Sequence, residues 1–157
     1  MKLKTWFAAA AVAALAACSV DSPTVTLVID PPPALPAGTD TVTTASGLKY
    51  AEITVGTGTV AQAGSQVSVH FTGWLLNGTA FTTTRGSSAY TFVLGNGREI
   101  AGFDEGVRGM KEGGRRRLII PPALGYGAQA QTDANGRVVI PANSTLIFDV
   151  DLVSVQG

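Results

Sequence analysis

The sequence predicts an α+β domain in which a five- to six-stranded antiparallel sheet wraps around one short helix. Residues 67–72 and 144–155 alternate between apolar and polar side chains, as strands with one buried face do. After residue 95 this alternation stops, and Phe103 and Val107 lie four residues apart, as on one side of a helix. Several strands and a single short helix favour a sheet that packs against that helix.

Turn residues separate the predicted strands and set their number. Asn77-Gly78 favours a tight hairpin, and Pro121-Pro122 ends the strand that precedes it. Polar residues 129–137 are predicted to form a loop. The remaining predicted strands cover residues 48–55, 79–84, 90–94 and 115–120. Residues 46–157 are enough for one domain with one core.

Residues 1–17 resemble a bacterial lipoprotein signal peptide. The apolar run Trp6–Ala17 is too short for an ordinary transmembrane helix. It ends in Leu15-Ala16-Ala17-Cys18, which resembles the lipobox, where cleavage precedes the cysteine and the cysteine receives lipid. The alternative is an ordinary secretory signal with an incidental cysteine. Cys18 is the only cysteine, so the chain forms no internal disulfide.

The resemblance to a lipoprotein implies a location in the cell envelope. Ser19 after the cysteine resembles outer-membrane sorting, so in a double-membraned host we expect a lipid-anchored protein facing the periplasm. Residues 18–45 are rich in Pro and Thr and are predicted to form a flexible tether. Within them Val25–Ile29 has strand-like character, and it either pairs with a sheet edge or binds nothing.

Charge excludes one broad class of partner. The chain has 11 basic and 11 acidic residues, and removal of a signal containing Lys2 and Lys4 leaves a mildly acidic protein. This balance argues against general nucleic-acid binding. Arg115–Arg117, with Arg108 and Lys111, forms a local basic cluster. We interpret it as a solvated turn and strand start, with contact to anionic lipid or an acidic client as the alternative.

The usual catalytic devices are missing from the sequence. With one histidine and a lipidated cysteine, no zinc site is expected, and no other metal or cofactor is predicted. His70 lies on the polar side of its strand, where a hydrogen-bonded structural role is favoured over a catalytic base. No Gly-x-Ser-x-Gly motif is present. An enzyme with this inventory works without a nucleophile or a metal.

One reaction suits such an inventory. Rotation about an X–Pro bond needs no covalent step, because its barrier of about 18–20 kcal/mol is the loss of amide resonance. The twisted amide has less charge separation than the planar amide, so an apolar, water-poor pocket favours it over the ground state. The requirement is an aromatic box large enough for a proline ring.

Seven segments resemble one known family in order and spacing. They are Val69–Gly73, Gly78–Phe81, Phe92–Gly95, Ile100–Gly106, Leu124–Gly127, Ile140–Leu146 and Phe148–Val150. Together they resemble the FKBP family of peptidyl-prolyl cis–trans isomerases over about residues 46–156. The resemblance implies the fold already predicted, isomerase activity and proline-containing polypeptide clients.

The resemblance also implies a set of site residues. Phe103 takes the place of the family's pocket-floor tryptophan, the Ile100 N–H resembles the donor to a substrate carbonyl, and Tyr126 resembles the loop tyrosine that donates to ligand. The implied catalytic residues are Phe71, Phe81, Ile100, Phe103, Tyr126 and Phe148. The implied substrate-binding residues are Thr82, Tyr90, Glu99 and Ile140.

Two positions depart from the family pattern. The family most often has tyrosine in place of Phe71 and aspartate in place of Thr82. We therefore expect an active isomerase that binds macrolide inhibitors less well, and we expect a monomer. The alternative is a membrane-tethered chaperone that holds unfolded clients without catalysis, which would need a larger exposed apolar patch.

Overall fold

The computed structural model describes residues 31–157. The predicted signal peptide, Cys18 and Val25–Ile29 lie outside the described residues. Within residues 31–157, no helix combines the length and hydropathy needed to cross a membrane.

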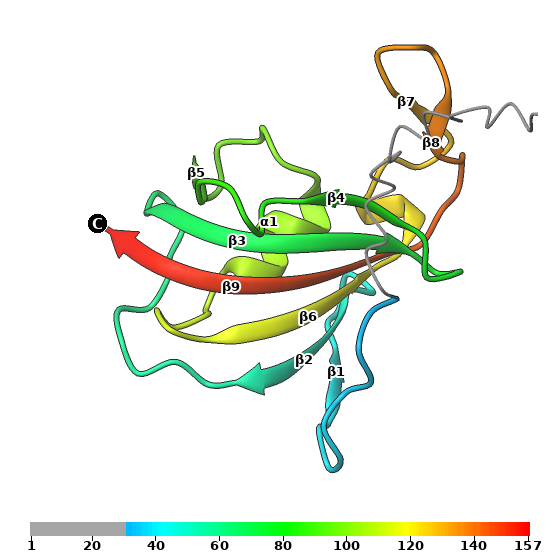
Figure 1. Ribbon diagram of the computed structural model, residues 1–157. Coiled ribbons are helices and arrows are strands. Elements are labelled where there is room, and N and C mark those ends of the chain that lie inside the picture. Colours follow the sequence, from blue (N-terminus) through cyan, green and yellow to red (C-terminus); the bar gives the residue numbers. More distant parts are fainter. Residues whose placement is uncertain (1–30) are drawn as a thin grey trace, which may run out of the picture.

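The described chain is built around an antiparallel sheet and one short α-helix, as predicted (Figure 1). The sheet's seven strands in residues 31–157, two more than the lower expected number, are β1 (Thr41–Thr43), β2 (Lys49–Thr54), β3 (Gln66–Leu75), β4 (Ala80–Thr83), β5 (Tyr90–Val93), β6 (Arg115–Ile120) and β9 (Leu146–Gln156). The order is β1-β2-β6-β9-β3-β4, and β5 also pairs with β3. The helical elements are α1 (Ala101–Val107) and the 3-10 turn η1 (Pro122–Leu124).

A small hairpin stands apart from the main sheet. Its strands β7 (Gln131–Thr132) and β8 (Val138–Ile140) occupy and extend the predicted loop. The Asp133 carboxylate fixes the turn between them, because it accepts the backbone N–H groups of Asn135 and Arg137, each at 2.9 Å. With only two and three residues, these strands are too short for alternation to reveal them.

Strand β1 corrects the predicted extent of the tether. Residues 18–45 were expected to be flexible, but Thr41–Thr43 pair with Lys49–Ala51 of β2 and form an edge of the sheet. All three β1 residues are exposed, so no apolar pattern marks them in the sequence. Backbone pairing, rather than side-chain burial, makes this segment part of the domain.

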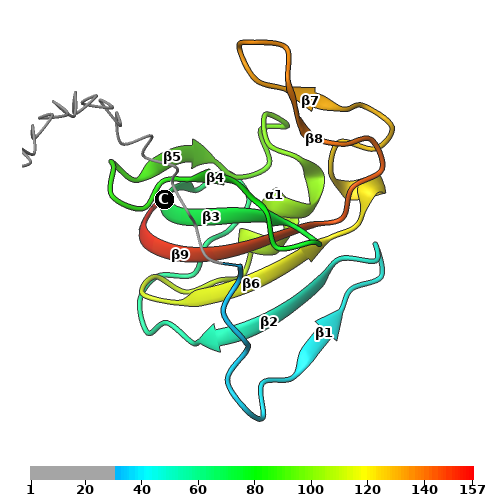
Figure 2. The ribbon, with the colours of Figure 1, turned by 45° about the vertical axis from the view of Figure 1, so that its right-hand side comes forward.

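The sheet curves over α1, as Figures 1 and 2 show. The face toward α1, here called the inner face, carries the apolar residues of the central strands β3, β6 and β9. On it Gly73, Leu118 and Phe148 lie side by side in register. Phe103 and Val107 of α1 are buried against this face, which confirms the predicted apolar side of the helix.

Two local features hold α1 in place. Gly106 lets the helix approach β6 closely, since a Cβ at that position would lie 2.5 Å from Leu118 Cδ1. Asp104 connects the helix to the preceding turn: its carboxylate accepts the Gly95 N–H at 2.7 Å and pairs with Arg108 at 2.9 Å. The short helix is therefore positioned by tertiary contacts more than by its own length.

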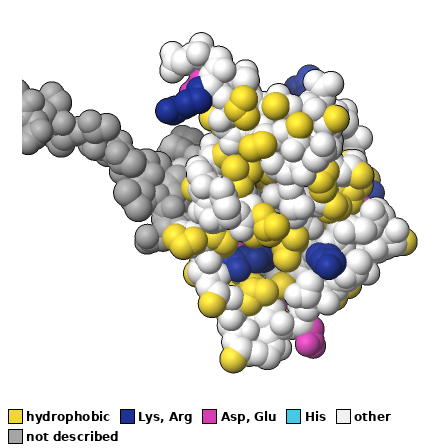
Figure 3. Space-filling model, turned by 90° about the vertical axis from the view of Figure 1, so that its right-hand side faces the viewer, with side chains coloured by type: hydrophobic (Ala, Val, Ile, Leu, Met, Phe, Trp, Pro, Cys, Tyr) yellow, Lys and Arg dark blue, Asp and Glu magenta, His cyan; other side chains and the backbone are white. Residues whose placement is uncertain are grey.

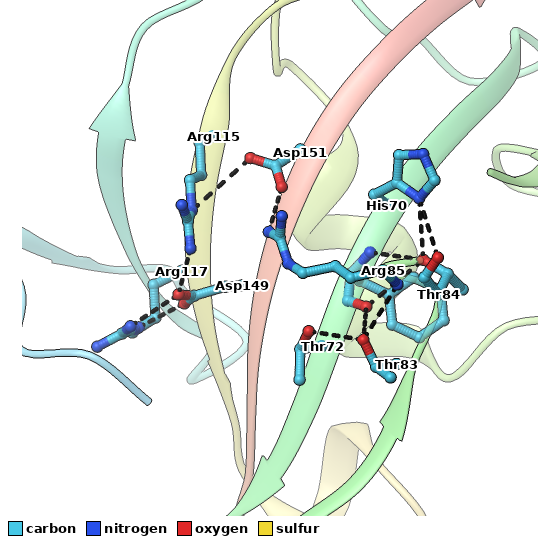
Figure 4. A network of polar contacts seen from close by, with 10 residues as sticks. His70, Thr72, Thr83, Thr84, Arg85, Arg115, Arg117, Asp149 and Asp151 are labelled. Carbon is cyan, nitrogen blue, oxygen red and sulfur yellow. Dashed lines mark hydrogen bonds and ion pairs between the residues drawn. The ribbon is translucent and has the colours of Figure 1, made fainter. Parts of the chain in front are cut away.

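The opposite face of the sheet, here called the outer face, contains buried charge (Figure 4). Asp149 is fully buried, and Arg117 binds it through Nε–Oδ1 at 2.5 Å and Nη2–Oδ2 at 2.8 Å. Arg115 reaches the same carboxylate at 3.1 Å. Arg85 pairs with the neighbouring Asp151. The prediction that this basic cluster is solvated is wrong for Arg117. Its side chain is buried because the Asp149 carboxylate on the adjacent strand β9 compensates its charge.

Arg116 alternates to the inner face and is also buried. Its Nε donates to Glu52 at 2.9 Å and its Nη1 donates to the Gly106 carbonyl at 2.7 Å. Its guanidinium lies 4.5 Å from the centre of the Tyr50 ring, a cation–π distance. Arg116 therefore ties β6 to β2 and to the end of α1, which the solvated interpretation did not anticipate.

The segment before β1 also contacts the outer face. Arg117 Nη1 donates to the Pro33 carbonyl at 2.7 Å, so the guanidinium that binds Asp149 also holds the N-terminal segment. Figure 2 shows this segment passing in front of the sheet before it reaches β1. His70 lies on the same face with its Nδ1 3.2 Å from the Thr84 carbonyl, which confirms its predicted hydrogen-bonded role (Figure 4).

Candidate active site

A pocket of about 280 Å³ opens at the inner face of the sheet beside the start of α1. It is lined by Phe71, Phe81, Thr82, Arg98, Glu99, Ile100, Phe103, Tyr126, Gln131, Ile140 and Phe148. The residues come from the sheet, from the entry to α1, from the loop after η1 and from the small hairpin. The pocket therefore exists only when these separate parts of the chain fold together.

The structure brings together all but one of the site residues named from the sequence. The exception is Tyr90, which does not line the pocket but contacts Phe71 at a ring-centre distance of 6.0 Å. Two lining residues, Arg98 and Gln131, were not predicted. Arg98 directly precedes Glu99, which was named from the sequence, so the position of Glu99 could have indicated Arg98. Gln131 lies in β7, which was predicted as loop.

Four phenylalanine rings form the floor and walls. Phe103 lies 5.3 Å from both Phe71 and Phe148, and all these contacts are edge-to-face. Phe81 packs against Phe148 at 5.5 Å in the same geometry. Edge-to-face contacts are favourable and fix the ring orientations. The pocket wall is therefore an apolar surface of defined shape.

Gly73 is required for this arrangement of rings. It pairs with Phe148 across β3 and β9. A Cβ at this position would lie 2.7 Å from Phe148 Cε1 and 2.8 Å from Phe81 Cζ, closer than carbon atoms approach. The missing side chain therefore makes the space in which the two rings meet.

Ile100 lies at the N-terminal boundary of α1. Its carbonyl accepts the N–H groups of Phe103 and Asp104, at 3.0 and 3.2 Å. Within residues 31–157, its own N–H finds no protein acceptor, and its side chain lines the pocket. The site therefore has a backbone donor that a ligand carbonyl can use.

Tyr126 presents a polar group at the pocket wall. The ring is half-buried between Gly125 and Gly127, and no residue in 31–157 accepts its hydroxyl proton. Burial raises the pKa of Tyr126, and the negative charge of Glu99 raises that pKa further. The hydroxyl therefore stays protonated at neutral pH and can donate a hydrogen bond to a ligand.

Tyr90 and Glu99 form a pair at the pocket mouth. The Tyr90 hydroxyl donates to Glu99 Oε1 at 2.5 Å. This hydrogen bond, with burial and the Glu99 charge as smaller causes, raises the pKa of Tyr90 to about 12. Tyr90 thus acts on the site through Glu99, whose carboxylate it orients.

The pocket lining has the chemistry of a binding box. It contains no serine, cysteine, histidine or lysine that could act as a nucleophile or as a general base, and its two charged residues are Arg98 and Glu99. Apolar rings with a few hydrogen-bond donors suit a reaction in which no covalent bond is exchanged.

Comparison with known proteins identifies the class that this fold and site define. Residues 57–153 match the family described as FKBP-type peptidyl-prolyl cis–trans isomerase. The chain belongs to this family and is an FKBP-type peptidyl-prolyl cis–trans isomerase, as its sequence motifs indicated.

Individual relatives support the assignment. An FK506-binding protein of Neisseria meningitidis serogroup B is 46% identical over 110 residues, which cover 69% of this chain and 96% of that protein. The crystal structure of AtFKBP13 matches 75% of this chain and 99% of its own, with a TM-score of 0.68 and 33% identity. FkpA from Escherichia coli matches 74% of this chain at a TM-score of 0.63 and 36% identity. This chain spans 51% of FkpA, so that likeness concerns only the domain they share.

Proposed function

We propose that this isomerase assists the folding of cell-envelope proteins while a lipid on Cys18 anchors it to a membrane. Support for the anchor comes from Leu15–Cys18, which has the composition of a lipobox at the end of an apolar run. Ser19 supports sorting to the outer membrane with the domain facing the periplasm. Its substrates in this setting are X–Pro bonds of unfolded polypeptides.

The observation that carries the catalytic proposal is the box of phenylalanine rings without a nucleophile. Phe71, Phe81, Phe103 and Phe148 enclose the proline ring and exclude water from the amide. The twisted amide is less polar than the planar one, so it loses less solvation in this box. The barrier of about 18–20 kcal/mol falls because the pocket binds the twisted state more strongly.

The polar groups hold the chain on both sides of the rotating bond. The Ile100 N–H and the Tyr126 hydroxyl donate to substrate carbonyls, which fixes the backbone while the bond turns. Thr82, Glu99 and Ile140 contact the flanking residues at the pocket wall. Tyr90 orients Glu99 through the hydrogen bond between their side chains.

Phe71 and Thr82 determine the response to macrolide inhibitors. Both line the pocket, where the family most often has a tyrosine hydroxyl that donates to an aspartate. Because donor and carboxylate are both replaced, neither group is left buried without a partner, and isomerase activity is retained. Inhibitors that use the carboxylate as an acceptor bind less well.

The inhibitor proposal is tested by a double-mutant cycle. Phe71→Tyr with Thr82→Asp should increase FK506 affinity more than the two single changes added together, because the new groups bind each other. Thr82→Asp alone should give only part of that gain. Equal affinity of the wild type and the double mutant would contradict the proposal.

Two measurements test the envelope role. Cys18→Ser should abolish lipid labelling and move the protein from the membrane to the soluble fraction, with unchanged activity on a peptide. Retention of this variant on membranes after a high-salt wash would show that lipid is not the anchor. Proline-limited refolding, compared with suppression of aggregation, separates the isomerase from a chaperone that only binds. Acceleration of refolding without suppression is the expected result.

A further inference from the structure

A second hollow lies beside the active-site pocket, between the β3–β4 hairpin and the β7–β8 hairpin. Its volume is about 410 Å³, within the range of roughly 300–1,000 Å³ typical of ligand clefts. Its apolar lining consists of Leu75, Ala80 and Phe81 on one wall and Val138, Val139 and Pro141 on the other. Figure 3 looks onto this side of the molecule, where hydrophobic side chains gather between separate charged groups. We call this hollow the hairpin groove.

The hairpin groove adjoins the active-site pocket, because the two share one wall residue. Phe81 lines both spaces, and Ile140 lines the pocket while its neighbours Val139 and Pro141 line the groove. An extended polypeptide bound in the pocket that passes over Phe81 therefore reaches the groove. An extended chain advances about 3.3 Å per residue, so the groove lies within a few residues of the bound proline.

The chemistry of the groove favours a neutral apolar occupant. Val138 is 53% exposed although it is part of the apolar wall. The one charged lining residue, Arg137, has its Nε 3.6 Å from Asp133 Oδ2, and its side chain is 83% exposed, so solvent screens its charge. The groove therefore offers apolar contact without strong attraction for an acidic group.

We propose that the hairpin groove is a second client subsite, which binds an apolar side chain about two to four residues from the proline being isomerised. The proposal rests on the pocket holding that proline, as proposed above. It makes the two hairpins a determinant of substrate choice: clients with a leucine, isoleucine, methionine or phenylalanine at this distance are preferred. Burial of that side chain supplies the preference.

The test is a peptide series assayed with the full chain in detergent. A short capped Ala-Leu-Pro-Phe peptide is compared with longer peptides in which one leucine is moved along Gly/Ser flanks on either side. Both kcat/KM and Kd are measured, by exchange spectroscopy and calorimetry. Leucine in the right position should raise kcat/KM and tighten Kd about five- to tenfold relative to serine, as expected for burial of one apolar side chain.

Two variants on opposite walls make the test specific. Val138→Asp places a charge in the groove, and Thr79→Trp fills it from an exposed turn position. Each should abolish the leucine preference while leaving the short peptide unaffected. Val153→Asp is the matched control, since Val153 is 47% exposed on β9 and does not line the groove.

The outcomes separate this proposal from the proposed function. The groove proposal would be overturned if no leucine position changed kcat/KM or Kd. It would also be overturned if both variants lost the same fraction of kcat/KM on the short and the long peptides. If the wild type does not isomerise the short peptide, the proposed role of the pocket is wrong. The ratio of Kd for the long peptides to Kd for the short peptide would still show whether the groove binds leucine. If both Val138→Asp and Thr79→Trp kept the preference for leucine, the groove proposal would also be overturned.

Discussion

The two faces of the sheet are buried by different physical means. The inner face is covered by α1 and packed with apolar and aromatic side chains, among them Phe103, Phe148 and Leu118. The outer face buries Asp149 completely and leaves Arg117 only 7% exposed. An apolar face is stabilised by every methylene it buries, whereas a buried ion pair depends on both partners being present. The difference teaches that a change on the inner face costs stability in proportion to the apolar volume it removes, whereas removal of one charge on the outer face leaves its partner buried and unpaired.

The largest expected effect lies on the inner face. Phe103→Ala should lower the free energy of unfolding by about 3–5 kcal/mol and abolish isomerase activity, because it removes the ring at the centre of both core and pocket. Urea unfolding and peptide isomerisation measure the two effects. Phe103→Leu is the control and should keep the fold while it reduces activity. Equal stability of Phe103→Ala and the wild type would show that the ring is not packed as described.

The next effect lies on the outer face. Asp149→Asn should cost about 3 kcal/mol of unfolding free energy, because Arg117 and Arg115 then lose their carboxylate. The double variant Asp149→Leu with Arg117→Met removes both charges and should recover much of this loss. Calorimetry of the single and double variants checks this. Independent, additive losses would mean that the two side chains do not act as a pair.

A smaller effect is expected from removal of the N-terminal segment. A chain that begins at Thr44 lacks β1 and the Pro33 acceptor, whereas one that begins at Pro31 keeps both. We expect the shorter chain to be less stable by about 1–2 kcal/mol, the range of one or two net hydrogen bonds. The comparison is made by thermal unfolding. Identical transitions would show that neither β1 nor the contact between Pro33 and Arg117 adds stability.

Tyr126→Phe should separate binding from stability. The hydroxyl has no partner within residues 31–157, so its loss should change stability by less than about 0.5 kcal/mol. Loss of a donor to ligand should weaken substrate or inhibitor binding several-fold. Calorimetric titration and urea unfolding of the same variant give both values. A drop in stability without any loss of affinity would contradict the assigned role.

The smallest effect is confined to high pH. The pKa of Tyr90 is raised to about 12 from 10.0, so the folded state holds this proton more tightly than the unfolded state does. The resulting stability is fully present below pH 10 and is lost as the pH rises from 10 to 12. Tyr90→Phe should therefore show a shallower decline than the wild type over this range. Parallel curves would exclude this contribution of the bond to Glu99.

Most of the inner face could be predicted from the sequence. Alternation in β3 and β9 and the pair Phe103–Val107 reflect burial of one side of an element, which leaves a periodic trace in the residue types. The resemblance then named nine of the lining residues: seven lie in the motif segments, and Thr82 and Glu99 directly adjoin them. Tyr90, named as a substrate-binding residue, lies behind the lining, where it contacts Phe71 and Glu99.

The outer face could not be predicted in the same way. Three consecutive arginines look solvated, and only the register Arg117–Asp149 shows that a carboxylate lies opposite the third. Strands β1, β7 and β8 bury few apolar side chains, so their backbone pairing leaves no periodic pattern. Gln131 was missed for this reason, because its approach to the pocket depends on the β7–β8 hairpin.

The contact between Pro33 and Arg117 fixes where the proposed tether joins the folded domain. If Cys18 carries the proposed lipid, residues 18–30 connect it to the described chain, and a polyproline segment of that length spans roughly 40 Å. Arg117 holds Pro33 at the outer face, and Pro31 lies beside Gly78 at the turn between β3 and β4, where an added Cβ would be 3.1 Å from Pro31 Cβ. The proposed anchor would therefore join the domain at the end of the sheet where the β3–β4 hairpin lies, and the length of the tether would limit how far from the bilayer the domain binds a polypeptide.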